Sequence, residues 1–154
     1  MSTRLKAIVS GANGFLGTTF METFRRTKSS EALGLVRRDA GPGTVATDYS
    51  PMSLGGIFRR YQPEMIIHAA GLASVSLSIA RPEKDRESSI GLVKSILSEL
   101  RNMDEAPPFI YISSAAVYGN PAQQPVAEDS ELAPISPYGE HRRECEKLIY
   151  DYVA

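Results

Sequence analysis

The sequence lacks several features that mark large classes of proteins. It has a single cysteine, Cys145, so it cannot form an internal disulfide, and this predicts a reducing compartment, the cytoplasm. Its longest apolar run near the start, Ala7 to Val9, is too short for a secretory signal, and no stretch could span a membrane. Its two histidines, His68 and His141, are too isolated to predict a metal site.

An excess of charge of one sign is also absent. Lysine and arginine number 17, aspartate and glutamate number 18, and the formal net charge is −1. The basic residues are spread along the chain, so we expect neither nucleic acid nor a membrane as a partner. With 154 residues and 42% apolar side chains, the chain is long enough to bury a core and is expected to form one globular domain.

Short apolar runs alternate with stretches of helical periodicity. The runs do not alternate cleanly between polar and apolar residues, which is typical of strands covered on both faces in a parallel sheet. We therefore expect an α/β fold with helices on both faces of that sheet. A long loop at 119–136 is either a functional segment or an ordered surface excursion. The predicted strands are 5–10, 32–36, 44–49, 65–70 and 109–113, and the predicted helices are 18–28, 53–61, 82–100 and 137–152.

The first predicted strand ends in a glycine-rich turn. Gly11 permits a tight exit from the strand, Gly14 lets backbone N–H groups approach a diphosphate, and Gly17 lets the next helix pack closely. Because the turn lies between a strand and a helix, it predicts a dinucleotide site, with a purely structural turn as the alternative. The residues expected to contact the dinucleotide are Gly11, Asn13, Gly14, Phe15, Leu16 and Gly17.

Two arginines follow the second predicted strand. Arg37 and Arg38 stand where NAD-binding chains carry an acidic residue that accepts hydrogen bonds from the adenosine ribose. A guanidinium group attracts a 2′-phosphate and can pair with it through two hydrogen bonds, so the arginines favour NADP. NAD stays possible, because Asp39 could replace the acidic contact and both arginines could simply be solvated.

Two later segments carry a more specific pattern. Residues 111–119 read Tyr-Ile-Ser-Ser-Ala-Ala-Val-Tyr-Gly, and residues 136–142 read Ser-Pro-Tyr-Gly-Glu-His-Arg. With the glycine turn, the His-Ala-Ala-Gly segment at 68–71 and the Pro-Val-Ala-Glu-Asp segment at 125–129, they resemble the extended short-chain dehydrogenase/reductase family. Its members are NAD(P)-dependent nucleotide-sugar epimerases, dehydratases and reductases. The resemblance implies a Rossmann-type doubly wound parallel sheet with strand order 3-2-1-4-5.

The resemblance also implies a catalytic set at the nicotinamide: Ser114, Tyr138 and the cation of Arg142. A tyrosine, whose usual pKa is about 10, is a poor base at neutral pH, so a nearby cation has to stabilise the phenolate. The phenolate then removes a proton from a substrate hydroxyl while the serine holds the same oxygen. The alternatives are an aromatic that packs at a helix start for Tyr138, and strand-end caps for Ser113 and Ser114.

Other positions are implied as coenzyme contacts. Asp48 stands where the family contacts adenine, with an exposed turn aspartate as the alternative. The small residues that follow the fourth predicted strand would let the coenzyme pass closely, although they also suit tight packing. The implied contacts are Asp48, Tyr49, Ala69, Ala70, Gly71, Ser113, Tyr138 and Arg142.

Two positions depart from the family pattern. Arg142 stands where the family has lysine, and its planar, bulkier guanidinium predicts impaired or atypical catalysis. Lys147 lies off that helix face and is no substitute. Ser88 stands where the family tends to carry asparagine, and its smaller side chain removes a longer positioning group. Cys145, between two glutamates, is not expected to be a nucleophile.

The chain stops close to the predicted tyrosine helix, whereas members of the family continue into further strands and a smaller sugar-binding domain. We therefore expect residues 1–154 to be the NAD(P)-binding Rossmann part of an epimerase, dehydratase or reductase that acts on a nucleotide-linked sugar by Tyr-assisted hydride transfer. This part is expected to be inactive alone. A non-catalytic dinucleotide-binding module is the alternative. The resemblance also implies a homodimer through helices 82–100 and 137–152.

Overall fold

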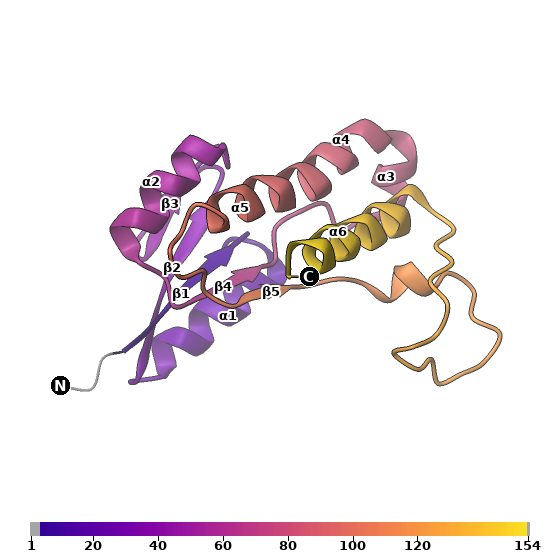
Figure 1. Ribbon diagram of the computed structural model, residues 1–154, viewed down its shortest axis with the longest axis horizontal. Coiled ribbons are helices and arrows are strands. Elements are labelled where there is room, and N and C mark those ends of the chain that lie inside the picture. Colours follow the sequence, from indigo (N-terminus) through magenta and orange to yellow (C-terminus); the bar gives the residue numbers. More distant parts are fainter. Residues whose placement is uncertain (1–3, 154) are drawn as a thin grey trace. The chain divides into compact units, whose positions relative to one another are not determined.

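The computed structural model describes residues 4–153, with residues 1–3 and 154 outside that range, and contains a five-stranded parallel sheet (Figure 1). The sheet order is β3-β2-β1-β4-β5, so β1 is central and pairs with β2 and β4. The predicted α/β class and strand order are confirmed. The strands are β1 (Leu5–Ser10), β2 (Ser30–Val36), β3 (Thr44–Ala46), β4 (Met65–His68) and β5 (Phe109–Tyr111).

Contacts divide the chain into two compact units. The first comprises the described residues up to Ala70 together with Ser95–Ile112, and it contains all five strands. The second comprises Gly71–Lys94 and the described residues from Ser113 onward. The helices are α1 (Phe15–Arg26), α2 (Pro51–Tyr61), α3 (Val75–Ala80), α4 (Pro82–Arg86), the π-helical turn η1 (Glu87–Gly91), α5 (Leu92–Leu100), the 3₁₀ turn η2 (Ala115–Tyr118) and α6 (Pro137–Val153).

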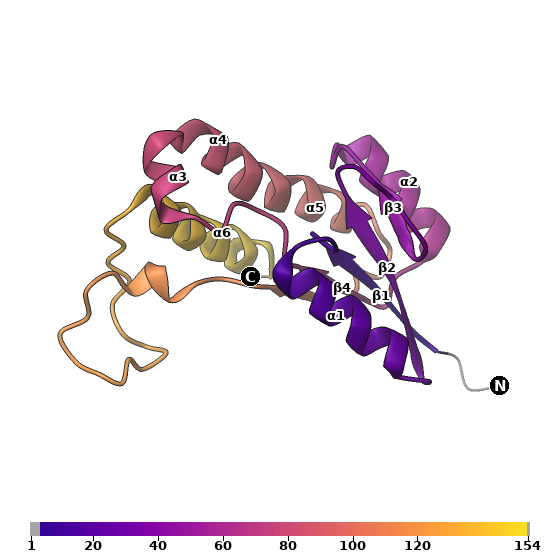
Figure 2. The same cartoon turned by 180° about the vertical axis from the view of Figure 1, so that it is seen from behind.

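Helices cover both faces of the sheet in the first unit. Successive side chains of a strand point to opposite faces. Val9 and Ile67 form a buried cluster with Met21 of α1 on one face. Their neighbours Ile8 and Ile66 are fully buried on the opposite face, where α2 lies (Figure 2). Both faces are therefore apolar, which explains why the strands show no polar–apolar alternation.

Two helices begin earlier than their periodicity predicts. The start of α1 is Phe15 and not residue 18, because Gly14 is its N-cap and the end of the glycine turn forms its first turn. The start of α2 is Pro51 and not residue 53. Its N-cap, Ser50, accepts a hydrogen bond from Ser53 N–H, and proline suits the first helical position.

Three strands end earlier than predicted, at Ala46, His68 and Tyr111. Their last paired positions lie opposite the ends of their neighbours, as His68 lies opposite Ser10 at the end of β1. After its last pair, each strand makes one more backbone hydrogen bond to its neighbour and then turns away from the sheet. An example is the bond from Ile112 N–H to the His68 carbonyl. The residues that follow, such as Ala70 and Ser113, are partly buried but no longer belong to a strand.

The helix predicted at 82–100 is interrupted by η1. Ser88 Oγ donates to the Asp85 carbonyl at 3.2 Å, and this competition for a backbone acceptor accompanies the π-helical turn. Two short elements, α3 and η2, were not predicted, because six and four residues are too few to show a period. The helix predicted at 137–152 is confirmed as α6.

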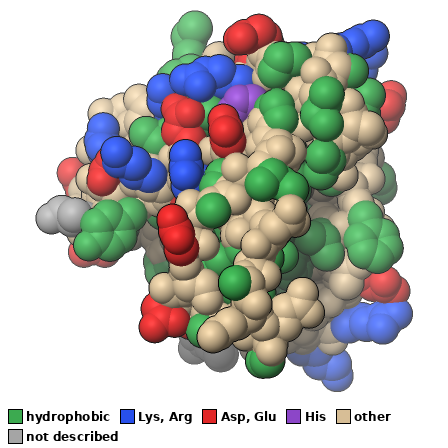
Figure 3. Space-filling view, turned by 90° about the vertical axis from the view of Figure 1, so that its right-hand side faces the viewer, with side chains coloured by type: hydrophobic (Ala, Val, Ile, Leu, Met, Phe, Trp, Pro, Cys, Tyr) green, Lys and Arg blue, Asp and Glu red, His purple; other side chains and the backbone are tan. Residues whose placement is uncertain are grey.

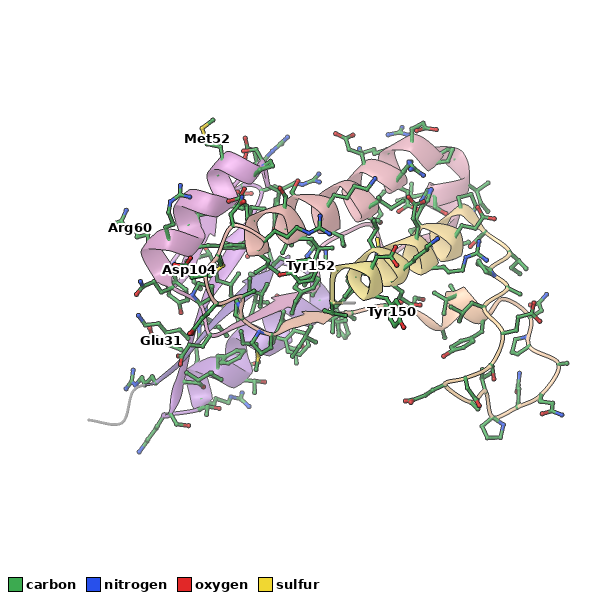
Figure 4. All side chains as sticks on the ribbon, viewed as in Figure 1. Glu31, Met52, Arg60, Asp104, Tyr150 and Tyr152 are labelled. Atoms are coloured by element: carbon green, nitrogen blue, oxygen red, sulfur yellow. The ribbon has the colours of Figure 1, made fainter. Side chains whose placement is uncertain are left out.

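Residues 119–136 form the long loop, which contains no helix or strand. Gly119 opens it at φ 63, and a Cβ there would collide with the Ala133 carbonyl, so the loop folds back on its own start. In the part of the chain that the structure describes, no helix is both long and apolar enough to cross a bilayer. Met52 and Arg60 project outward from α2, away from the sheet (Figure 4).

Candidate functional site

The glycine turn joins β1 to α1 in the first unit and is held by backbone hydrogen bonds. Gly11 N–H and Ala12 N–H both donate to the Leu35 carbonyl, at 3.0 and 3.2 Å. Gly14 N–H donates to the Gly11 carbonyl at 2.8 Å. Gly11 has a φ of 71, and a Cβ there would lie 2.8 Å from Ala70 Cα, so glycine is required on both counts.

The other two glycines of the turn differ in what they require. A Cβ at Gly17, which is buried, would lie 2.7 Å from the Gly11 carbonyl carbon, so the fold itself needs glycine there. Gly14 is exposed and has an ordinary φ of −79, and a Cβ there would meet only the Gly11 carbonyl oxygen, at 3.1 Å. The fold itself therefore requires glycine at position 14 less strictly than at positions 11 and 17.

The start of α1 suits an anion. The first N–H groups of a helix have no acceptor within it, and Gly14 as N-cap supplies no side chain to receive them. No acidic side chain lies in the first turn of α1 to neutralise the positive end of the helix. Phe15, 90% exposed, stands beside these amides in solvent. The residues present thus fit the diphosphate of a dinucleotide.

Arg37 and Arg38 follow β2 and are both exposed. Asp39, also exposed, has a φ of 57, a left-handed conformation that aspartate tolerates in turns. Within residues 4–153 no ion pair joins either guanidinium to a carboxylate. Both arginines therefore remain available to an added phosphate.

Asp48 and Tyr49 lie between β3 and α2 in opposite environments. Asp48 is exposed, and its Oδ1 accepts a hydrogen bond from Ser50 N–H at 2.9 Å, which lowers the pKa of the carboxyl group. Tyr49 is 3% exposed. Burial raises the pKa of its phenol, while the hydrogen bond from Gly11 N–H and the charge of Arg37 act in the opposite direction. The Tyr49 hydroxyl group is thus hydrogen-bonded to other groups of the protein.

The end of β4 approaches the glycine turn closely. Ala69 N–H donates to the Ser10 carbonyl, and Ala70 lies against Gly11. His68, at the end of β4, is 1% exposed, and its Nδ1 lies 2.6 Å from Ser10 Oγ. His68 is thus a hydrogen-bonded core histidine. The small residues at this strand end are explained at least in part by tight packing against the turn.

The second unit contains Tyr138 and Arg142, one turn apart on α6. The Arg142 guanidinium lies 4.9 Å from the centre of the Tyr138 ring, within range of a cation–π interaction. Arg142 is 5% exposed, and its Nη2 donates to the Leu72 carbonyl at 2.8 Å. A Cβ at Gly71 would lie 3.1 Å from that nitrogen, so Gly71 makes room for the guanidinium. The arginine is therefore held against the tyrosine ring.

The two serines after β5 have separate partners. Ser114 is the N-cap of η2, and its Oγ accepts a hydrogen bond from Ala116 N–H at 3.2 Å. Ser113 Oγ donates to Glu146 of α6. A Cβ at Gly139 would lie 2.5 Å from the Ala116 carbonyl oxygen, so α6 packs directly on η2 at the residue after the tyrosine. Glycine at 139 thereby brings the elements that carry Ser114 and Tyr138 together.

Side chains without a predicted role anchor α6 in the second unit. Ser78 of α3 is fully buried, and its Oγ accepts a hydrogen bond from Tyr138 N–H at 3.1 Å. Asp85 of α4, 0% exposed, is joined to His141 Nδ1 at 2.8 Å. Ser136 Oγ receives Gly139 N–H. Only the serine before Pro137 had a sequence signal, the preference of helix N-caps for serine.

Charge on the second unit is mixed. Arg86 and Glu144 form an exposed ion pair at 3.2 Å, and Figure 3 shows Lys and Arg side chains interleaved with Asp and Glu on one face of the molecule. Among residues 4–153, no group of three or more His, Cys, Asp or Glu side chains could hold a metal ion. Cys145 is fully buried.

Strand, glycine turn and helix at the centre of a 3-2-1-4-5 sheet define a dinucleotide-binding fold of the Rossmann type. The sequence profile of the NAD dependent epimerase/dehydratase family matches residues 7–154, and the chain belongs to that family. The resemblance inferred from the motifs is thereby confirmed.

Individual proteins agree with this family. UDP-glucose 4-epimerase 3 of Oryza sativa subsp. japonica is 29% identical over 86% of this chain and 40% of its own length. UDP-glucose 4-epimerase of Bacillus subtilis is 27% identical over 94% of this chain and 47% of its own length. The crystal structure of UDP-glucose 4-epimerase from Brucella ovis in complex with NAD superposes with a TM-score of 0.89 at 26% identity, covering 96% of this chain and 47% of that one. The chain spans about half the length of the relatives it matches.

Replacing Gly17 and Gly14 by alanine should separate the needs of the fold from those of a ligand. We expect Gly17→Ala to lower the free energy of unfolding by about 2 kcal/mol or more, because its Cβ would displace the Gly11 carbonyl. Gly14→Ala should cost less than about 1 kcal/mol, since its φ suits alanine. Urea unfolding followed by circular dichroism measures both. Equal losses would show that Gly14 is also a requirement of the fold.

Proposed function

We propose that this chain supplies the coenzyme-binding and proton-transfer residues of an NAD(P)-dependent enzyme that acts on a nucleotide-linked sugar, as an epimerase, dehydratase or reductase. The observation that carries the proposal is the glycine turn, whose exposed Gly14 and helix start leave backbone amides for a diphosphate. The coenzyme would supply a nicotinamide ring that accepts and returns hydride. UDP-glucose 4-epimerases among the relatives favour a UDP-sugar as the substrate.

The chain's own residues divide the binding task. Amides from Phe15 to Gly17 hold the diphosphate, and the exposed Asn13 and Leu16 border it. The exposed Asp48 carboxylate accepts hydrogen bonds from adenine. The small residues Ala69, Ala70 and Gly71, together with Ser113, are the remaining proposed neighbours of the coenzyme.

Arg37 and Arg38 favour a coenzyme with a 2′-phosphate. Both guanidinium groups are exposed at the end of β2, and one phosphate could accept two parallel hydrogen bonds from either of them. NADP is therefore the proposed coenzyme, and NAD, which the Brucella ovis enzyme contains, is the competitor.

Tyr138 is the proposed proton acceptor. It would take the proton of a sugar hydroxyl group while hydride passes from the carbon that bears this hydroxyl to the coenzyme. Ser114 Oγ would hold the hydroxyl oxygen by a hydrogen bond. Arg142 is the proposed cation of the set, and its guanidinium lies 4.9 Å from the centre of the tyrosine ring. Tyr138 stays in place because Ser78 holds its amide.

One observation favours a second candidate, a dinucleotide-binding module without turnover. The Arg142 guanidinium is already committed to the Leu72 carbonyl and the tyrosine ring, whereas the family's lysine presents a compact ammonium group. In this alternative Arg142 serves to brace the structure, and the chain binds its coenzyme without reducing it.

Coenzyme binding tests the site. We expect the chain to bind NADP or NAD in isothermal titration calorimetry, and Gly14→Ala to raise the dissociation constant about tenfold or more, because the added Cβ stands where the diphosphate approaches. Gly56→Ala, in α2 where a Cβ meets nothing within 4 Å, is the matched control and should bind like wild type. Heat from neither coenzyme with the folded wild-type chain would refute the proposal.

The two arginines after β2 should decide between the coenzymes. Arg37→Ser combined with Arg38→Ser removes the charges that attract the 2′-phosphate, so NADP affinity should fall about 10-fold while NAD affinity changes less than about 2-fold. Competition titrations with both coenzymes measure the ratio. A wild-type chain that binds NAD more tightly, or a variant that loses both affinities equally, would contradict the NADP assignment.

Turnover distinguishes an enzyme from a binding module. The coenzyme-loaded chain is mixed with UDP-sugars, and both the absorbance of reduced nicotinamide and the chromatographic profile of the UDP-sugars are followed, because an epimerase or dehydratase returns the hydride and leaves no net reduced coenzyme. If the chain reacts, Tyr138→Phe should slow the reaction about 100-fold or more, because the proton acceptor is lost. Arg142→Lys restores the family's cation, and activity that appears only in this variant indicates an impaired enzyme. Turnover by the wild-type chain would refute the binding module.

A further inference from the structure

Tyr49 places its hydroxyl group beneath the glycine turn. It lies between β3 and α2, 38 residues after Gly11, and is 3% exposed. Gly11 N–H donates to Tyr49 Oη at 3.1 Å, and Oη donates to the Leu35 carbonyl at 3.0 Å. One hydroxyl group thus joins the backbone at the ends of β1 and β2.

The backbone around Tyr49 is fixed in a conformation that directs the ring to this place. Tyr49 has a φ of 60, in the left-handed region that a bulky residue rarely adopts. Two bonds hold it there: Tyr49 N–H donates to Thr47 Oγ1 at 3.0 Å, and Thr47 N–H donates to the Val36 carbonyl at 2.8 Å. A strained residue persists when its surroundings determine it, and such residues cluster at ligand sites.

The hydroxyl group helps to fix which amides of the turn face a ligand. Gly11 N–H and Ala12 N–H are directed inward, and Gly14 N–H is donated to the Gly11 carbonyl. The peptide groups on both sides of Gly11 are therefore held from within the protein. The amides that follow Gly14 open α1, have no acceptor within the helix and receive no side-chain cap from Gly14.

We propose that Tyr49 is a positioning residue for the coenzyme, which acts through the Gly11 amide and not by contact with the ligand. It joins the corner of Asp48, the proposed adenine contact, to the turn proposed to hold the diphosphate, so that ordering one orders the other. This inference rests on the proposed function, because it assumes that the turn binds the diphosphate. When one part of the coenzyme orders this shared segment, the other part then binds at a lower cost in entropy.

Tyr49→Phe tests the proposal, because it removes the hydroxyl group and keeps the buried ring. In the whole chain, we expect amide hydrogen exchange at Gly11 to become faster, and the dissociation constants of the coenzyme and of inorganic pyrophosphate to rise about 3- to 10-fold, the effect of one net hydrogen bond. Affinity for adenosine, which does not reach the turn, should stay within about 2-fold of wild type. NMR exchange rates and titration calorimetry provide these measurements.

Tyr61→Phe, at the last residue of α2, makes the same chemical change away from the turn and should leave all three affinities unchanged. Equal coenzyme affinity in Tyr49→Phe and wild type would overturn the inference. So would an equal loss for adenosine and coenzyme, since that pattern means a general loss of structure. If the wild-type chain binds no coenzyme at all, the proposed function itself fails, and this inference fails with it.

Discussion

The contact between Gly17 and the Gly11 carbonyl governs the first unit. Because residue 17 has no side chain, α1 can begin directly above the turn that leaves β1. That start sets the direction of the helix axis and leaves the first amides of α1 without an acceptor in the helix. It also brings Met21 onto the sheet, where it packs with Val9 and Ile67. One missing methyl group therefore links the core of the unit to the turn that is proposed to hold the diphosphate.

In the second unit, buried hydrogen bonds fix the position of α6, in addition to the close packing at glycine. The first two turns of α6 are held by Ser78 at the Tyr138 amide, by Ser136 at the Gly139 amide and by Asp85 at His141. Each bond satisfies a group that is partly or fully removed from water, and an unsatisfied buried group is costly. The position of the tyrosine is thus determined by three side chains from three separate segments, and such support would suit the proposed role of Tyr138 as a proton acceptor.

Sequence patterns predicted the features that depend on local spacing. The strand order follows the family resemblance, and the glycine turn is recognisable from three glycines between a strand and a helix. The buried anchors could not be found in this way. Ser78 lies in a helix of six residues, and the partners Asp85 and His141 are 56 residues apart, so no periodicity connects them. Tyr49 was named as a ligand contact, but sequence could not reveal that its hydroxyl group is bonded to a glycine amide 38 residues earlier.

The bond between Asp85 and His141 limits how the second unit can be dissected. Asp85 lies on α4 with no exposed surface, and its partner is contributed by α6, near the other end of the chain. A fragment cut within the long loop would retain the aspartate and lose the imidazole, at a cost of about 1–3 kcal/mol for a stranded polar group. The α3–α4 segment is therefore a poor candidate for a peptide that folds alone. A shortened version of the protein has to contain both α4 and α6.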